Sequence, residues 1–389
     1  MSKSELPDRL YYLDHLRGFL VILVILHHLA LVYGAFAPFY YQEPPFTDPM
    51  AFMLSGVFVL FNQAWFMGAL FLLAGYFTPG SYDRKGAASF LKSRLIRLGI
   101  PILAGIFLLE PIARLGFFLM PVSLTGITDA PTWATYPKLL GLGPLWFVLM
   151  LLIFNVGYAL WRSILGGKET PTLSKDVFPG YLAIGIFTLA LALVNFLWRM
   201  VVPMGRDITL FTGVLSFPTI AYLAQYLSLF VLGLVAYRRG WLQSLPDFKG
   251  LAGFVAAAIA AILLFPLAIS GQFLSLEFAE QTQFLGGGSW QSAIYTIWDS
   301  IMVVGLSLGA VVVFRRFFNG TGWFGRFLSR QSYAVYIIHS PIIVFIAYAM
   351  RDISLPPIAK FGLAALIVVP VCFAVAYAIR KVPLVDKVL

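Results

Sequence analysis

Titratable side chains concentrate in one apolar stretch of this chain, YYLDHLRGFLVILVILHHLALVYG, at residues 11–34. On an α-helix, Arg17 and His28 are eleven residues apart, so they lie within about 20° of one face with a rise of about 16 Å between them. Asp14 lies about 60° from Arg17 on the same flank, whereas His27 points about 100° away from His28. A neutral mid-membrane histidine can act as a general base, and an arginine at the rim can bind an anion.

Both residues also have structural interpretations. Arg17 could be an interfacial anchor whose charged head reaches the water, and His28 could be a buried polar group that bridges two helices. Ionisable groups within membrane spans are rare and usually functional. Their shared face favours a joint role.

A second basic cluster lies in FLKSRLIRLGIP, residues 90–101. Arg94 and Arg97 are three residues apart and share a helix face at the expected cytoplasmic entrance of the third span. Lys92 is interpreted as one of the basic residues that anchor a span on its cytoplasmic side. The same interpretation is an alternative for Arg94 and Arg97. Paired guanidinium groups also bind phosphate oxygens through two hydrogen bonds each, so the pair predicts a phosphate clamp.

The two clusters together fit a long ligand with phosphates at one end and a reactive group at the other. Coenzyme A has this shape, with a nucleotide phosphate head and a thin arm that ends in a thioester. The arginines would hold the head, and the arm would extend about 16 Å to the histidine. His28 could then take a proton from an acceptor hydroxyl as it attacks the thioester.

The elements that must position these residues are membrane helices. The chain has 389 residues, of which 60% are hydrophobic and only 11% are charged, whereas soluble domains have about 25% charged residues. We therefore predict an all-α integral membrane protein, a single domain over residues 1–389, with ten spans of about 20 residues. The predicted spans are 12–37, 51–78, 98–119, 144–165, 178–199, 217–237, 250–270, 290–314, 332–350 and 357–379.

The lysines and arginines predict the orientation. With the N-terminus in the cytoplasm, the inner segments contain 20 lysines and arginines and the outer segments contain 4. This asymmetry is typical of a multi-pass plasma (inner) membrane protein with both termini in the cytoplasm. The net charge of +10 is explained by the same bias, so no nucleic-acid partner is predicted.

Other ionisable groups lie within the predicted spans. Glu110 and Arg114 are four residues apart and are expected to neutralise each other. Asp299 has no basic neighbour on its own helix, and we hypothesise that it is a functional carboxylate that orients or charges His28. His339 is expected to bond between helices near the kink produced by a proline two residues later.

Five phrases also occur in the order typical of one known family. They are Arg17 and His28 with ten residues between them, FLLAGYF with Phe71, Gly75 and Tyr76, Arg94 and Arg97 in RLIRLGIP, GPLWFVLML with Leu145–Phe147, and SRQSYAVYIIHSP from Ser329 to His339. The chain thereby resembles the transmembrane acyltransferases of acyltransferase family 3. The phrases YLDHLRG and GYF resemble most the branch that contains the periplasmic-glucan succinyltransferase. Ala74 departs from the serine that is common before Gly75 in the family, so any role of that serine is absent here or filled by another group.

The resemblance implies transfer of an acyl group, acetyl or succinyl, from cytoplasmic acyl-CoA to a hydroxyl of an extracytoplasmic or lipid-linked glycan. His28 would be the general base, and Arg17, Arg94 and Arg97 would bind the donor or organise the site. Asp14 could orient Arg17 through a charge-assisted pair, or merely lower its insertion cost. No metal is expected, because the sequence has one cysteine and no Cys/His zinc spacing.

Two alternatives remain at this stage. A secondary transporter would use His28, Asp299 and Glu110 as a midplane site for a proton or substrate, although the sequence has no internal repeat of the kind many transporters show. A lipid- or glycan-flipping component would have no chemistry at all. The sequence leaves the acyl group, the acceptor and the oligomeric state open.

Overall fold

The computed structural model describes residues 10–43, 48–164, 177–211, 213–270 and 280–389. Within these ranges, ten helical segments are long and apolar enough to cross a membrane, which confirms the predicted number of spans. The single-helix spans are α1 (Tyr11–Gly34), α2 (Pro49–Lys85), α8 (Trp146–Ile164), α9 (Tyr181–Val201), α10 (Leu223–Arg239), α12 (Asp247–Ala268), α13 (Trp290–Phe317), α14 (Trp323–Ala349) and α15 (Pro357–Ile379). The remaining span, Ala87–Leu119, is segmented.

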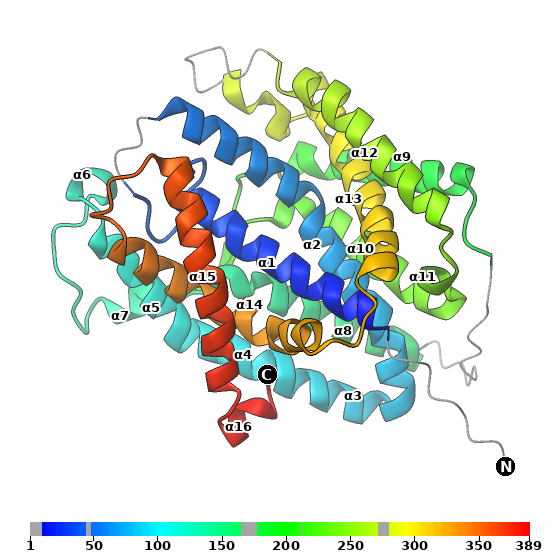
Figure 1. The fold of residues 1–389 in the computed structure, drawn as a ribbon, viewed down its shortest axis with the longest axis horizontal. Helices are drawn as coiled ribbons and strands as arrows, with labels where there is room; N and C mark the ends of the chain where they lie inside the picture. The colour runs from blue at the N-terminus through cyan, green and yellow to red at the C-terminus, as the bar shows by residue number, and fades with distance from the viewer. Residues whose placement is uncertain (1–9, 44–47, 165–176, 212, 271–279) are drawn as a thin grey trace.

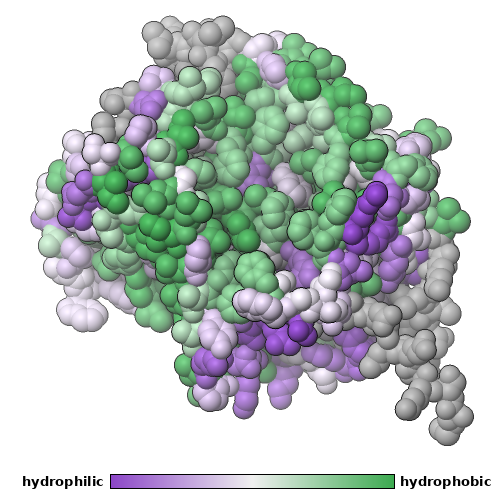
Figure 2. Space-filling view, in the orientation of Figure 1, coloured by the Kyte–Doolittle hydropathy of each residue, from purple (hydrophilic) through white to green (hydrophobic). Residues whose placement is uncertain are grey.

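Because the ten spans alternate in direction, the bundle has two ends. The terminal end contains residue 10, Gly86 and residues 380–389, and the opposite end contains the connections at 35–43, 120–142, 202–211 and 213–219. Figure 2 shows an apolar band across one face of the molecule, with hydrophilic side chains gathered below α15 at the terminal end. The assignment of the terminal end to the cytoplasm remains a prediction.

Helix α1 occupies the centre of the bundle, between α2, α14 and α15 (Figure 1). Apart from its few ionisable residues, apolar side chains surround this helix on every face, as expected of a helix enclosed by others. Leu13, Leu20 and Ile25 are fully buried. By contrast, α9 and α12 lie at the edge of the bundle. Only 17% and 22% of the residues in their most apolar stretches are buried. The predicted site helix is therefore well shielded from lipid, with 61% of its most apolar stretch buried.

Helices α2 and α10 approach each other closely through glycine. A Cβ atom on Gly75 would lie 2.1 Å from the carbonyl oxygen of Phe230, and one on Gly233 would lie 2.2 Å from the carbonyl oxygen of Leu72. Small residues allow membrane helices to pack backbone against backbone, because no side chain separates them. This contact fixes α2 beside α10.

The third span begins at Ala87 and not at the predicted residue 98. It contains two π-helical turns, η1 (Leu95–Gly99) and η2 (Gly105–Leu109). Pro101 has no N–H to donate to the carbonyl of Arg97, and that oxygen accepts a hydrogen bond from Tyr333 Oη on α14 at 2.6 Å. The predicted clamp arginines therefore lie within a distorted helix that is tied to α14.

The second π turn is tied in the same way. Pro111 has no N–H for the carbonyl of Phe107, which accepts a hydrogen bond from Tyr136 Oη at 2.5 Å. At the same end, β1 (Ile208–Leu210) and β2 (Leu215–Phe217) form an antiparallel hairpin that follows α9. Residues at the ends of the hairpin line the cavity described next.

Candidate active site

A cavity of about 490 Å³ opens among the spans near the opposite end of the bundle. Helix α1 contributes His27 and His28 to its wall, and α5 (Glu110–Arg114) contributes Glu110 and Arg114. The loop at 37–40, η4 (Gly143–Leu145) and the hairpin segments at 205–207 and 216–219 supply much of the rest. The cavity therefore connects the middle of the bundle with the end remote from both termini.

The predicted base, His28, is paired with His339 of α14. The Nδ1 atom of His28 lies 2.9 Å from the carbonyl oxygen of Val24 and 3.1 Å from Nε2 of His339. The Nδ1 atom of His339 lies 2.6 Å from the carbonyl oxygen of Tyr336. A carbonyl oxygen only accepts hydrogen bonds, so Nδ1 of each neutral ring carries the hydrogen. His339 Nε2 is then an acceptor for the His28 Nδ1–H group.

This assignment leaves His28 Nε2 with a lone pair. No other described residue donates to that atom, and His28 is only partly buried because it lines the cavity. His339, by contrast, is completely buried. The pair thus has the arrangement of a general base held in one tautomer by a second group.

The partner of His28 was not predicted, although bonding between helices was expected of His339 and is confirmed. Both α1 and α14 begin at the terminal end, where Tyr11 and Trp323 are their first residues. His28 is the eighteenth residue of α1 and His339 is the seventeenth of α14, so the two rings lie at similar depth. The ninth span was predicted to start at residue 332, which placed His339 nearer the terminal end than His28 and concealed their similar depth.

The predicted donor residues lie at the terminal end around the first turns of α14. Arg17 Nη2 lies 3.3 Å from Asp14 Oδ1, which confirms the ion pair, and donates to the carbonyl oxygen of Ser329 at 3.4 Å. Tyr333, four residues along α14, bonds to the backbone of Arg97. The arginine end and the histidine end are therefore linked by two parallel helices, α1 and α14.

Arg94 and Arg97 lie close enough to repel each other electrostatically. In the described part of the chain, no carboxylate lies within ion-pair distance of either guanidinium group, and Arg94 lies 5.0 Å over the ring of Phe90. Lys85 adds a further positive charge nearby, with its ammonium group bonded to Ser93 at 2.9 Å. Uncompensated positive charge of this kind suits an anionic ligand.

Comparison with known proteins agrees with this geometry. A family model described as an acyltransferase domain matches residues 10–377, nearly the whole chain. The chain belongs to the acyltransferase 3 family. It is 24% identical over 348 residues to glucans biosynthesis protein C of Shigella dysenteriae serotype 1, which covers 87% of this chain and 83% of the relative. It is 26% identical over 375 residues to the protein of the same name from Salmonella gallinarum, covering 91% and 87%.

Membership of the acyltransferase 3 family confirms the predicted resemblance and makes the protein a multi-pass membrane acyltransferase. The matched region contains α1 to α15 almost completely, so the histidine pair and the arginines all lie within the acyltransferase domain.

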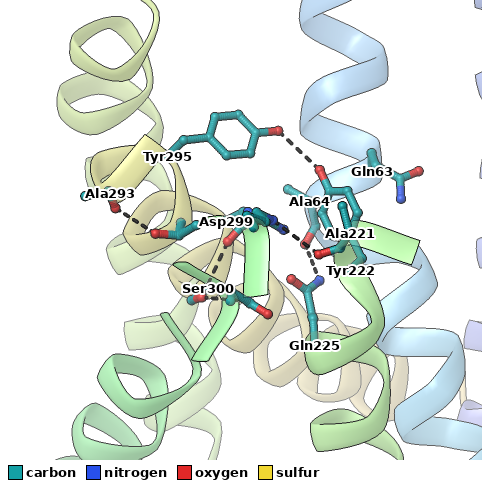
Figure 3. Close-up of polar contacts among 12 residues, drawn as sticks. Gln63, Ala64, Ala221, Tyr222, Gln225, Ala293, Tyr295, Asp299 and Ser300 are labelled. Atoms are coloured by element: carbon teal, nitrogen blue, oxygen red, sulfur yellow. Dashed lines mark hydrogen bonds and ion pairs between the residues drawn. The ribbon is translucent and has the colours of Figure 1, made fainter. Parts of the chain in front are cut away.

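Asp299 does not join the histidine pair of this acyltransferase domain. Its Oδ2 atom lies 2.6 Å from Nη1 of Arg199 on α9, and both side chains are completely buried. Figure 3 shows Asp299 among Ser300, Tyr295 and Tyr222, and no contact with His28 is found among the described residues. The basic partner of Asp299 is therefore on another helix, and the hypothesis that Asp299 orients or charges His28 does not hold. Arg199 is the last residue of the span predicted at 178–199, and this position concealed it as a partner.

Glu110 and Arg114 form the predicted ion pair, with Arg114 Nε 2.7 Å from Glu110 Oε1. They also line the cavity, and Tyr40 Oη donates to Glu110 Oε2 at 2.8 Å. Burial, together with the Glu110 carboxylate, raises the pKa of Tyr40 well above its usual range, so Tyr40 remains a donor. Asp299 and Glu110 are thus each paired with a different arginine. The transporter alternative would instead place both carboxylates in one midplane site.

Proposed function

We propose that this membrane acyltransferase transfers an acetyl or succinyl group from acyl-CoA to a hydroxyl of an extracytoplasmic or lipid-linked glycan. The observation that carries the proposal is the His28–His339 pair, in which the Nε2 lone pair of His28 is available at the cavity. Acyl transfer to a hydroxyl requires removal of the hydroxyl proton, and neutral histidine is the usual base for that step.

In the proposed reaction, the acceptor hydroxyl oxygen attacks the thioester carbonyl carbon while His28 Nε2 takes its proton. The positive charge that develops on the His28 ring is stabilised by its Nδ1–H bonds to the carbonyl of Val24 and to Nε2 of His339. The tetrahedral intermediate then expels the coenzyme A thiolate, which recovers the proton from His28. The C–O bond forms, the C–S bond breaks, and no covalent acyl-enzyme is needed.

The donor would enter from the terminal end, which the lysine and arginine distribution assigns to the cytoplasm. Arg94 and Arg97 have no carboxylate partner among the described residues and would bind phosphate oxygens. Arg17 lies on the same helix as His28, about 16 Å away along the axis, and Asp14 would orient it. This distance suits the pantetheine arm of coenzyme A.

The acceptor would enter from the opposite end, where the cavity opens beneath the hairpin. Aromatic rings such as Phe117 and Trp146 line it together with polar groups such as Gln63, Asp207 and Thr219. Aromatic faces and hydrogen-bonding side chains together suit sugar rings, which present C–H faces and hydroxyl edges. The names of the Shigella and Salmonella relatives refer to glucans, and this supports a glycan as the acceptor class.

The test is transfer of radiolabelled acetyl and succinyl groups from their coenzyme A thioesters to a panel of glycans by the purified protein. His28→Ala should lower transfer about 10²–10⁴-fold, the contribution typical of a general base. His15→Ala is the matched control, because His15 lies at the terminal end and bonds to the carbonyl of Phe318 at 2.5 Å. Equal transfer by His28→Ala and the wild type would exclude His28 as the base.

A binding measurement tests the donor site separately. Arg94→Ala and Arg97→Ala should each weaken coenzyme A binding roughly tenfold, since hydrogen bonds to charged groups contribute about 1.5–3 kcal/mol. Lys92→Ala, an exposed neighbour, should change the Kd little. Unchanged affinity in both arginine variants would contradict the phosphate clamp.

A further inference from the structure

A second imidazole, that of His27, lies on the wall of the same cavity. Its ring stacks on Phe66 of α2 at a centroid distance of 5.3 Å and an interplanar angle of 21°. It meets the ring of His28 edge-on, at 5.5 Å and 81°. Only 8% of His27 is exposed. Two rings about 100° apart on one helix reach the same cavity because it lies between α2, which His27 faces, and α14, which His28 faces.

The two nitrogens of His27 have different surroundings. Nδ1 is enclosed and has no hydrogen-bond partner in the described part of the chain. Either tautomer leaves Nδ1 unpaired, but an enclosed N–H group without an acceptor is rarer in folded proteins than an enclosed lone pair without a donor, and a hydrogen on Nε2 can be paired by a molecule in the cavity. The hydrogen therefore belongs on Nε2, the nitrogen that is not enclosed. His27 thus offers a donor to the cavity, whereas His28 offers an acceptor.

Two other polar side chains of the cavity wall are already engaged as donors. The Gln63 amide donates to Tyr226 Oη at 2.8 Å, and Arg114 donates to Glu110 and to the carbonyl of Lys138. His27 is the donor nearest along the chain to the predicted base and has a rigid ring held by stacking. A preorganised donor next to a base is what a reaction with a developing oxyanion requires.

We propose that His27 is a further catalytic residue of the acyl transfer, with its Nε2–H group donating a hydrogen bond to the thioester carbonyl oxygen as that oxygen becomes an oxyanion. This inference rests on the proposed function. As the acceptor oxygen bonds to the carbonyl carbon, the π electrons move to the carbonyl oxygen, and His27 stabilises that charge without losing its proton. When the oxyanion collapses, the C=O bond re-forms, the C–S bond breaks, and His27 is unchanged.

The proposal is tested with His27→Phe, which keeps a ring for stacking on Phe66 but removes the donor, and with His27→Gln, which supplies an amide N–H. His27→Phe should lower kcat about 10²–10³-fold, as loss of an oxyanion donor does in other enzymes, with the Kd of acyl-CoA and the KM of the acceptor within about threefold of wild type. His27→Gln should recover at least about tenfold of that loss. Thermal melting checks that both variants fold, and His27→Ala provides a smaller donor-free variant.

The outcomes separate this role from the proposed function. If the wild type transfers acyl groups and His27→Phe does so within about threefold of its kcat, the role of His27 is wrong and the proposed function stands. Equal kcat values for His27→Gln and His27→Phe, both well below wild type, would also overturn a donor role. If the wild type transfers no acyl group from any coenzyme A thioester, the proposed function itself is overturned.

Discussion

Replacement of His339 by phenylalanine tests the contribution of the histidine pair, because it keeps an aromatic ring in a buried position and removes the acceptor for His28 Nδ1–H. It also removes the Nδ1–H group that donates to the carbonyl of Tyr336. His339 Nε2 lies 3.1 Å from His28 Nδ1, and the carbonyl of Val24 shares the same donor at 2.9 Å. A hydrogen bond to a charged group contributes about 1.5–3 kcal/mol. Because Val24 retains part of the bond when the His28 ring is charged, we expect the lower end of that range.

A loss of about 1.5 kcal/mol in transition-state stabilisation corresponds to a fall of roughly tenfold in kcat. The assay is steady-state transfer of labelled acyl groups to a saturating glycan acceptor, with His28→Ala run beside it. His339→Gln is the matched control, since its amide oxygen can accept the same hydrogen bond, and it should retain kcat within about threefold of wild type. Melting temperatures of the three variants show whether the buried substitution at His339 disturbs folding.

Two results would refute this reasoning. A wild-type kcat for His339→Phe would mean that the bond between the two imidazoles does not assist the reaction. A loss as large as that of His28→Ala would mean that His339 is itself the proton acceptor and that His28 only positions it.

Three further predictions concern packing and pH. Arg199→Leu leaves the buried carboxylate of Asp299 without its arginine partner, so it should lower the free energy of unfolding by about 3–5 kcal/mol. Leucine at both positions should restore much of that loss. A single variant that melts at the wild-type temperature would contradict this. Gly75→Ala should destabilise by about 1–3 kcal/mol through overpacking, whereas Gly99→Ala, where nothing lies within 4 Å of the added carbon, should melt as wild type does. Glu43 forms an ion pair with Lys360 of α15. Burial raises the pKa of Glu43 against the opposing charge of Lys360, so the folded protein holds this proton more tightly than the unfolded chain. Stability should therefore be greatest below the ordinary glutamate pKa and fall as the pH rises to the raised one, and a melting profile of Glu43→Gln with the same pH dependence would count against this.

The number of spans could be predicted because hydropathy and the distribution of lysine and arginine depend only on local sequence. The start of the third span could not, because the helix continues through a polar rim from Ala87 that a hydropathy window excludes. At each π turn, a proline leaves one carbonyl oxygen without its N–H donor, and a tyrosine distant in sequence donates to that oxygen instead. Tyr333 does so for the carbonyl of Arg97. Such pairings depend on tertiary packing.

The candidate site was predictable where one helix contains both members of a pair. Arg17 and Asp14, which helical spacing placed side by side, do form an ion pair. The helical wheel correctly placed His27 and His28 on different faces of α1. It could not show that one cavity is lined by both side chains. The partners His339 and Arg199 lie on other helices, and their proximity depends on the depth at which each helix begins.

The most direct test of the account uses proteoliposomes in which the terminal end of the bundle faces one known side. Labelled acyl-CoA is supplied only on the terminal side and glycan acceptor only on the opposite side, and acylated glycan is measured. Transfer through the bundle predicts labelled glycan with the wild type and at least about 100-fold less with His28→Ala. Equal labelling by the two proteins, or labelling only when donor and acceptor share one side, would contradict transfer through the bundle at His28.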